Sequence, residues 1–363
     1  MTRPRIDQLL AGFADGDAIS NAALILRDTL RSLGHASDLF ADPDRVSPTL
    51  RDACGALDDY APGSDDITLY HYGIASPATD TFLKIPGSRI LVYHNITPAE
   101  YFNGYDDAVA HQLNVARKEL KTIAGQADAV WSVSRFNATE LEAMGLTDVR
   151  VLELPFGPAP LAPEGDPEVR NRLQAPLTTL LFVGRMAPNK RLEDLFQAFA
   201  WYNKTINPQS RLLVVGSDRS CPRYSAMLRM LIGDLVTPNI CLEGFASPAG
   251  LCAYYELSDL YISTSEHEGY CLPLLEAMYK GLPVISRNAG GVPEAMGNAG
   301  VRYEQASPRE LAELIHLVLS DRRLRTEVMD GQRKRMEQVR SRNLGEEITS
   351  LLEPIINTPK GES

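Results

Sequence analysis

The stretch LYISTSEHEGYCLPLLEAMYKGLPVIS, residues 260–286, decides the fold of this chain. It begins with a short apolar run, breaks into a polar loop, continues with a helical pattern of apolar residues and ends in a second apolar run. Strand, loop, helix and strand in this order indicate a βαβ unit with parallel strands. Gly269 permits close backbone approach in the loop, and Pro273 suits the first turn of the helix.

The same alternation recurs along the whole chain. Apolar runs that predict further strands lie at Ile67–Tyr72, Arg89–His94, Ala129–Val133, Val149–Leu154, Thr179–Val183, Arg211–Val215, Ile240–Glu243, Leu260–Thr264 and Pro283–Ser286. Helical patterns lie between them, for example at Leu192–Asn203, Leu272–Lys280 and Pro308–Leu319. Several strands are apolar throughout, as expected for parallel strands covered on both faces. The segment Leu154–Pro167 contains five prolines and is predicted to link two doubly wound α/β domains, residues 1–157 and 158–342.

Composition excludes several classes of protein. The 363 residues are 44% hydrophobic and 23% charged, which is typical of a globular protein with real cores. No apolar run approaches the roughly 18 residues that span a bilayer, and the N-terminus does not resemble a secretory signal, so we expect a cytoplasmic protein. Five cysteines without a Cys-x-x-Cys pair argue against disulfides and zinc. The net charge of −11 argues against nucleic-acid binding.

A basic motif lies in TTLLFVGRMAPNKRLEDLFQAF, residues 178–199. A buried strand is expected to end at Val183, Gly184 to allow a sharp turn, and a helix to begin near Asn189. Arg185 and Lys190 would then flank a strand-to-helix loop, where two cations and free backbone N–H groups suit a diphosphate. The alternative is a solvated basic pair on a surface loop.

Two carboxylates belong to the opening stretch. Glu268 lies on its polar loop, and Glu276 follows eight positions later, within about the first turn of the predicted helix. Carboxylates bind sugar hydroxyls well because they accept paired hydrogen bonds. The alternative is that both merely favour a helix N-terminus electrostatically.

Together these motifs resemble family 4 of the retaining glycosyltransferases, which have the GT-B fold: two Rossmann-like doubly wound domains facing a deep interdomain cleft. The resemblance rests on Gly-Arg-x-x-Pro-x-Lys from Gly184 and on Glu-Gly-Tyr-Cys-Leu-Pro-Leu-Leu-Glu from Glu268. It implies an N-terminal acceptor-binding domain, a C-terminal donor-binding domain, and a last helix at about 343–357 that packs back on the first domain.

The resemblance also implies roles for the residues of the second domain. Arg185 and Lys190 would bind the donor diphosphate, Glu268 the transferred sugar and Glu276 the ribose. The backbone beside the donor would come from Gly184, Gly269, Tyr270, Cys271 and Leu272, and the Cys271 thiol would only pack. In NAGGVPEAMGNAG, residues 288–300, Gly290 and Gly291 would shape the cleft wall, while Glu294 is either a turn residue or a ligand contact.

In the first half the resemblance is looser. The loop before a helix starting near Asn21 points to Gly16 and Asp17 as donor contacts, although a plain helix cap by Asp17 or Ser20 is the alternative. The preceding strand is only weakly indicated by IDQLL.

The resemblance assigns a catalytic histidine to the end of a strand in the first domain, and we choose His94. His71, which also ends a strand, is the main competitor, whereas His111 is expected on a helix surface. Ser134 is predicted to cap a helix.

The implied reaction is metal-independent transfer of a hexosyl unit, by preference mannosyl, from a GDP- or UDP-linked sugar to a glycan or lipid-linked acceptor in polysaccharide biosynthesis. His94, Glu268, Arg185 and Lys190 would be the catalytic residues, and no cofactor is expected. A noncatalytic nucleotide-sugar-binding or scaffolding protein is the alternative, and an epimerase or phosphorylase is a weaker one. Residues 322–342 carry eight basic side chains, which indicate a solvated helix face or, alternatively, approach to a membrane-bound acceptor.

Overall fold

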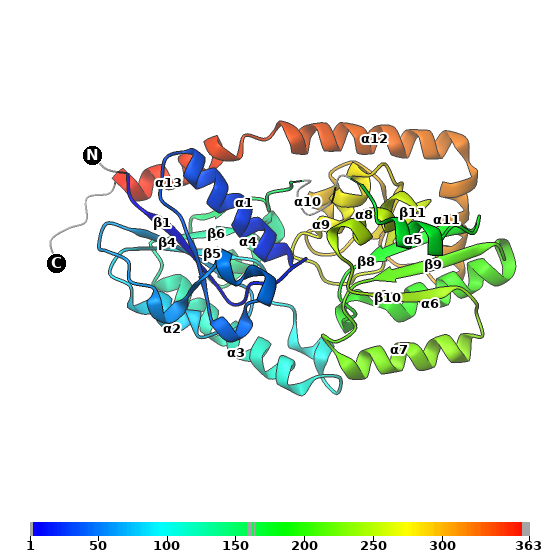
Figure 1. The fold of residues 1–363 in the computed structure, drawn as a ribbon, viewed down its shortest axis with the longest axis horizontal. Helices are drawn as coiled ribbons and strands as arrows, with labels where there is room; N and C mark the ends of the chain where they lie inside the picture. Colours follow the sequence, from blue (N-terminus) through cyan, green and yellow to red (C-terminus); the bar gives the residue numbers. More distant parts are fainter. Residues whose placement is uncertain (1–2, 158–161, 163, 358–363) are drawn as a thin grey trace. The chain divides into compact units, whose positions relative to one another are not determined.

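The computed structural model describes residues 3–157, 162 and 164–357 (Figure 1). Within these residues the chain forms two compact units. The first consists of 3–99, 111–157 and 342–357, and the second of 100–110, 162 and 164–341. Residues 100–110 belong to the second unit, although the sequence assigned them to the first domain. The linker predicted at Leu154–Pro167 lies partly outside the described residues, at 158–161 and 163.

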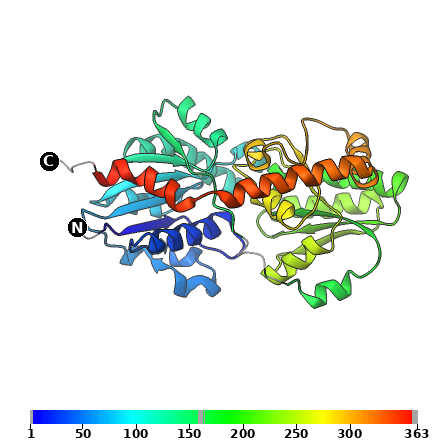
Figure 2. The same ribbon diagram turned by 90° about the horizontal axis from the view of Figure 1, so that it is seen from above.

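The first unit contains a parallel sheet of seven strands in the order β3-β2-β1-β4-β5-β6-β7. Its strands are β1 (Ile6–Leu10), β2 (Leu39–Ala41), β3 (Gly55–Ala56), β4 (Ile67–Tyr72), β5 (Ser88–Tyr93), β6 (Ala129–Ser132) and β7 (Val149–Val151). Its helices are α1 (Ala18–Ser32), α2 (Ala78–Lys84), α3 (Asp107–Gly125), whose residues 107–110 belong to the second unit, α4 (Arg135–Ala143) and α13 (Leu344–Asn357). Figure 2 shows α13 (red) beside α1 (dark blue), and the two helices are in contact.

Strand β1 contains two polar residues, which is why its sequence indicated a strand only weakly. All five of its residues are buried, including the polar Asp7 and Gln8. Asp7 accepts hydrogen bonds from Arg5 Nε at 2.6 Å and from the Asp38 backbone N–H at 2.9 Å. Buried polar groups persist where they are hydrogen-bonded, so β1 is a core strand despite its composition.

The second unit repeats the same topology with six parallel strands, in the order β10-β9-β8-β11-β12-β13. The strands are β8 (Thr178–Val183), β9 (Ser210–Val215), β10 (Ile240–Gly244), β11 (Leu260–Ser263), β12 (Val284–Arg287) and β13 (Val301–Tyr303). The helices are α5 (Pro167–Arg172), α6 (Leu192–Trp201), α7 (Pro222–Leu235), α8 (Pro248–Glu256), α9 (Leu272–Tyr279), α10 (Val292–Met296), α11 (Pro308–Ser320) and α12 (Arg322–Ser341). Figure 1 shows helices on both sides of this sheet. Both units therefore have the doubly wound order of Rossmann-like domains, which confirms the predicted fold class.

One helix start was predicted wrongly, and the loop before a second helix is longer than its motif suggested. Helix α1 begins at Ala18 rather than near Asn21, because Asp17 caps it by accepting from the Ser20 backbone N–H at 2.9 Å. Helix α6 begins at Leu192, where the predicted helical pattern Leu192–Asn203 begins, and not near Asn189. Residues Pro188–Lys190 form a separate 3-10 turn, and Arg191, with φ of 51°, is left-handed and cannot continue that turn into the helix. No described helix combines the length and the apolar character that crossing a bilayer requires.

Strand ends in the second unit approach each other too closely for side chains. A Cβ atom on Gly216 would lie 2.0 Å from the Gly184 carbonyl oxygen. The Gly216 backbone N–H donates to the Gly244 carbonyl at 2.7 Å, so the segment is also held from the other side. Only glycine fits at this position.

We therefore predict that Gly216→Ala destabilises the protein by about 3 kcal/mol or more, because backbone atoms have to move to admit the methyl group. The matched control is Gly233→Ala inside helix α7, where an added Cβ meets nothing within 4 Å. That change should stabilise the helix by roughly 0.5–1 kcal/mol. Thermal unfolding of both variants checks the pair, and an unfolding temperature of Gly216→Ala equal to that of the wild type would contradict it.

Candidate active site

The site in the second unit begins where its strand order reverses. Strands β8 and β11 are neighbours in the sheet, with Leu180 opposite Leu260 and Leu181 opposite Tyr261. The chain leaves β8 toward β9 on one side and leaves β11 toward β12 on the other. Loops that diverge in this way leave a crevice at the carboxyl ends of the strands, where open α/β sheets bind their ligands.

Both motifs from the sequence lie on these two loops, and the structure joins them. Lys190 Nζ donates to Glu268 Oε1 at 2.7 Å. The Lys190 side chain is 17% exposed and that of Glu268 is 10% exposed, so water screens this ion pair only weakly. Lys190 and Glu268, which the sequence assigned to the diphosphate and the sugar of the same donor, therefore lie in direct contact.

Backbone and side-chain hydrogen bonds tie the two loops together around this pair. Asn189 Nδ2 donates to the His267 carbonyl at 3.1 Å, and the Glu266 N–H donates to the Asn189 carbonyl at 2.8 Å. Thr264 Oγ1 donates to the Lys190 carbonyl at 3.0 Å. Asn189 and Thr264 were not assigned to the site from the sequence, because the bonds that give them this role are made to residues far along the chain.

A third loop, between β12 and α10, packs against the backbone of the second. The Gly291 N–H donates to the Glu268 carbonyl at 2.8 Å. A Cβ atom on Gly290 would lie 2.1 Å from the Glu268 carbonyl oxygen, and one on Gly291 would lie 2.3 Å from that of Gly269. The two glycines thus let the third loop support the residues that hold Glu268. The Glu294 backbone carbonyl accepts from Arg335 Nη2 at 2.8 Å, which fits a residue of the turn.

The segment between the two glutamates contains an unusual backbone. Cys271 caps α9 in a left-handed conformation, with φ of 75° and ψ of 69°, ahead of Leu272 at the first helical position. This conformation costs a residue with a side chain roughly 1–2 kcal/mol, whereas glycine adopts it freely. Burial, followed by the neighbouring Glu268 carboxylate, raises the pKa of the Cys271 thiol well above its ordinary value. A neutral thiol is a poor nucleophile, which supports packing as its role.

Glu276 lies deeper in helix α9 than predicted. It is the fifth residue of a helix that starts at Leu272 and so lies beyond the first turn, where the helix dipole would act most strongly. Its carboxylate accepts from the Tyr255 hydroxyl at 2.7 Å. Burial raises the pKa of Glu276, while the hydrogen bond from Tyr255 opposes that shift. Tyr255, on helix α8, is a positioning residue that no sequence motif indicated.

Arg185 differs from Lys190 in its surroundings. It follows Gly184, whose N–H donates to the Val215 carbonyl at 2.9 Å, and its side chain is exposed. Within the residues that the structure describes, its guanidinium has no hydrogen bond or ion pair. An unpaired arginine and a paired lysine therefore flank the same loop.

In the first unit, the structure favours the helix-cap interpretation of the Gly16–Asp17 loop. Asp17 Oδ2 accepts from both the backbone N–H and the hydroxyl of Ser20, each at 2.9 Å. The same hydroxyl accepts from the Ala14 N–H at 3.0 Å. Gly16 is exposed, with φ of 71°. Asp17 Oδ2 is thus occupied by the cap. Ser134 caps helix α4 as predicted, accepting from the Asn137 N–H at 3.2 Å.

The two competing histidines are in contact. His94 Nε2 lies 2.7 Å from His71 Nδ1, and His71 Nε2 lies 2.8 Å from Gln8 Oε1. Both ring nitrogens of His71 are therefore paired, and the residue is 1% exposed. His94 Nδ1 is buried without a hydrogen-bond partner among the described residues. This difference supports His94, rather than His71, as the histidine that can reach a ligand. His111 is exposed on α3, as expected.

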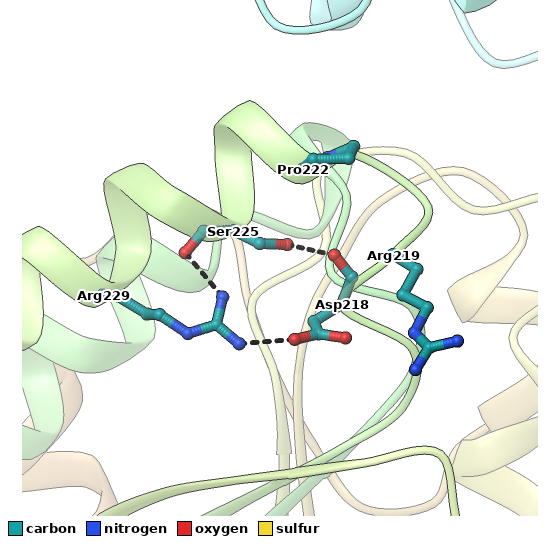
Figure 3. Close-up of a pocket in the computed structure, with 5 residues that line it drawn as sticks. All are labelled: Asp218, Arg219, Pro222, Ser225 and Arg229. Atoms are coloured by element: carbon teal, nitrogen blue, oxygen red, sulfur yellow. Dashed lines mark hydrogen bonds and ion pairs between the residues drawn. The ribbon is translucent and has the colours of Figure 1, made fainter.

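A separate polar hollow of about 360 Å³ lies beside the loop between β9 and α7 (Figure 3). Its lining residues are Asp218, Arg219, Pro222, Ser225 and Arg229. Ser225 Oγ donates to the Asp218 carbonyl at 2.7 Å, and Arg229 forms an ion pair with the Asp218 carboxylate. None of the residues predicted to bind the donor lines it, so we do not assign the donor site to this hollow.

Metal ligands and disulfides are not found in the described part of the chain. No three His, Cys, Asp or Glu side chains there are grouped as a metal ion would require, and all five cysteines are free. Metal independence remains a prediction.

Comparison with known proteins identifies the class. Residues 168–335 match the family described as glycosyl transferases group 1. The chain is 23% identical to the serotype-specific mannosyltransferase WbdA of Escherichia coli over 263 residues, covering 69% of this chain and 31% of WbdA. It is 26% identical over 254 residues to the GDP-mannose-dependent monoacylated alpha-(1-6)-phosphatidylinositol monomannoside mannosyltransferase of Corynebacterium glutamicum, covering 66% of this chain and 65% of that enzyme. The matches thus span less than two thirds of either relative.

The fold extends the likeness to the whole chain. The structure of Alr3699/HepE from Anabaena, in complex with UDP and glucose, superposes with a TM-score of 0.73 at 16% identity, covering 96% of this chain and 100% of that one. The two Rossmann-like units therefore define a protein of the GT-B fold. Its second unit matches the group 1 glycosyltransferase family over residues 168–335.

The buried histidine pair predicts how stability depends on pH. Burial lowers the pKa of His71 to about 3, and burial together with His71 lowers the pKa of His94 well below its usual value. Unfolded histidines bind protons below about pH 6.5, so His71 alone makes the folded state lose about 1.4 kcal/mol per pH unit as the pH falls from there toward 3. The lowered pKa of His94 adds a loss in the same direction. Denaturant unfolding between pH 4 and 7 should show this loss, with a shallower slope in His71→Asn. Equal slopes would contradict the prediction.

Proposed function

We propose that this protein is a retaining family 4 glycosyltransferase that transfers a hexosyl unit from a nucleotide-diphosphate sugar to a glycan or lipid-linked acceptor. The observation that carries the proposal is the Lys190–Glu268 pair at the strand reversal of a group 1 domain. The alternative is a noncatalytic nucleotide-sugar-binding protein of the same fold.

The chemistry follows from charge. When the anomeric C–O bond breaks, negative charge accumulates on the departing diphosphate. Arg185, which is exposed and unpaired within the described residues, and Lys190 would stabilise that charge without a metal ion. Glu268 holds Lys190 at 2.7 Å, so the cation is preplaced for the donor. A bound donor would engage Lys190 through phosphate and Glu268 through sugar hydroxyls.

The donor that we propose is GDP-mannose, with UDP-hexoses as the alternative. Two relatives with mannosyltransferase names support the sugar, and the Corynebacterium relative is named as GDP-mannose-dependent. HepE, in contrast, was crystallised with UDP and glucose. For retention of configuration we propose same-face substitution, in which the leaving phosphate helps to deprotonate the acceptor. We further propose a role in polysaccharide biosynthesis in the cytoplasm, at the inner face of the membrane when the acceptor is lipid-linked.

We expect Glu268→Ala and Lys190→Ala each to lower transfer at least about 100-fold, because each removes a preplaced group that acts on the transition state. Arg302→Ala is the control, since Arg302 is an exposed arginine on β13 of the same unit. A thermal-shift screen with GDP-, UDP-, ADP- and dTDP-sugars first identifies the donor, and a transfer or donor-hydrolysis assay then compares the variants. Circular dichroism confirms that each variant is folded.

Turnover of wild-type size in either site variant would refute the assignment of the site. Binding of a nucleotide sugar with neither transfer nor hydrolysis, for every sugar tried, would favour the noncatalytic alternative.

A further inference from the structure

We infer that Gln8 and His71 are positioning residues that hold His94 in the tautomer whose Nδ1 accepts a hydrogen bond, so that the ligand group bound there is a hydroxyl donor. The inference rests on the proposed function, because it concerns the donor sugar of that reaction. It goes further by giving a role to two buried residues and by stating which chemistry His94 can recognise.

A chain of hydrogen bonds, which we call the relay, runs from the Ala23 carbonyl through Gln8 and His71 to His94. It begins at a group that can take only one hydrogen-bond role. Gln8 Nε2 lies 3.0 Å from the carbonyl oxygen of Ala23 on helix α1. A carbonyl can only accept, so the amide nitrogen of Gln8 must face it. The opposite end of the same amide, Oε1, is therefore an acceptor, and it faces His71 Nε2 at 2.8 Å.

The assignment of hydrogen-bond donor and acceptor atoms then extends to both histidine rings. His71 Nε2 must carry the proton that Gln8 Oε1 accepts, so in neutral His71 the Nδ1 atom has a lone pair. His94 Nε2, 2.7 Å away, must donate to that lone pair. In neutral His94 the remaining Nδ1 is then an acceptor. Burial keeps both rings neutral at physiological pH, and His71 is the titratable group that acts on His94.

Sheet topology makes this relay possible. Gln8 lies on β1 and His71 on β4, neighbours at the strand reversal of the first unit, while His94 directly follows β5. Asn95, with φ of 82°, turns the chain after His94, and its Nδ2 donates to Asn137 Oδ1 at 3.0 Å and to Glu140 Oε2 at 3.2 Å. The hydrogen bonds of Asn95 thus anchor the backbone next to His94, and His71 holds the His94 ring.

The unpaired atom at the end of the relay defines the ligand chemistry. His94 Nδ1 is buried and has no partner among the described residues, a state that disfavours the free protein. A hydroxyl can donate to it, whereas the oxygens of a fully ionised diphosphate carry no proton and would be repelled. A sugar hydroxyl is therefore the group that His94 recognises, and the diphosphate is not.

The first experiment needs no substrate. In the full-length protein labelled with 15N-histidine, we expect the ring nitrogens of both His71 and His94 to show Nε2–H and unprotonated Nδ1 at pH 7.5. His71→Asn and His94→Asn variants assign the signals among the six histidines. An Nδ1–H tautomer at His94 would overturn the inference whether or not the protein transfers sugar, so its failure is distinct from that of the proposed function.

The second experiment uses donor analogues on the wild-type enzyme. The analogues replace one hydroxyl of the donor sugar by hydrogen (deoxy) or by fluorine (deoxyfluoro). For the hydroxyl that binds His94, both replacements should lower kcat/KM about tenfold or more, because neither hydrogen on carbon nor fluorine can donate a hydrogen bond to Nδ1. His94→Leu should abolish this discrimination. Tolerance of fluorine at every position where the deoxy sugar fails would overturn the inference.

Substitutions at His71 separate positioning from packing. His71→Leu removes the acceptor for His94 Nε2–H and should lower kcat about tenfold. His71→Asn can place Oδ1 near the position of the former Nδ1 and should restore most of that loss. The matched control is His35→Leu, which breaks a histidine–carbonyl hydrogen bond of 2.8 Å to Pro4 in the same unit and should leave kcat unchanged. Equal kcat for His71→Leu and His71→Asn would show that His71 only fills space.

Discussion

The reversal of strand order between β8 and β11 is the constraint on which the candidate site depends. Two neighbouring parallel strands send their loops to opposite sides, so their carboxyl ends stay uncovered by a crossover helix. Polar side chains can collect there without being buried in the core. Lys190 and Glu268 occupy the two diverging loops and meet at 2.7 Å. The second unit thus holds its charges at the one edge of the sheet where its topology leaves room for a ligand.

At this edge the backbones of neighbouring loops are packed closely together. Gly216 lies against Gly184, Gly290 against Glu268 and Gly291 against Gly269, each at a separation that leaves no space for a Cβ atom. Four loops are therefore packed in two pairs through their main chains, and the charged side chains project from this backbone. Cys271 is not a glycine, although its backbone, close to Glu268, is left-handed. That conformation costs free energy for a residue with a side chain. A preplaced charge needs little rearrangement when a ligand binds, which is the usual basis of electrostatic catalysis.

The two units handle buried polar groups in different ways. The second pairs opposite charges, Lys190 with Glu268, in a weakly screened environment. The first uses neutral groups in sequence, from the Ala23 carbonyl through Gln8 and His71 to His94. Charged side chains favour anionic and polyhydroxylated ligands. A chain of neutral hydrogen-bonded groups instead fixes whether its last atom accepts or donates, so it distinguishes hydrogen-bond donors from hydrogen-bond acceptors on the ligand. Recognition of a diphosphate and of a single hydroxyl would therefore rest on different physics in the two units.

The sequence by itself determined the two doubly wound domains, because continuous apolar runs and helical periodicity are local properties, and β4 was predicted to the residue. It also named Lys190 and Glu268, through loop positions at strand ends, and His94, through the family resemblance. Only the tertiary structure decided which of these side chains touch. Strand order brings Lys190 to Glu268 across 78 positions and Gln8 to His71 across 63, and no local pattern encodes such pairings. For the same reason the sequence could not settle the role of Asp17, whose Oδ2 atom caps α1, or reveal Tyr255 behind Glu276. A hydrogen bond depends on where two atoms lie in space, and for distant residues the packing of the sheet sets that position.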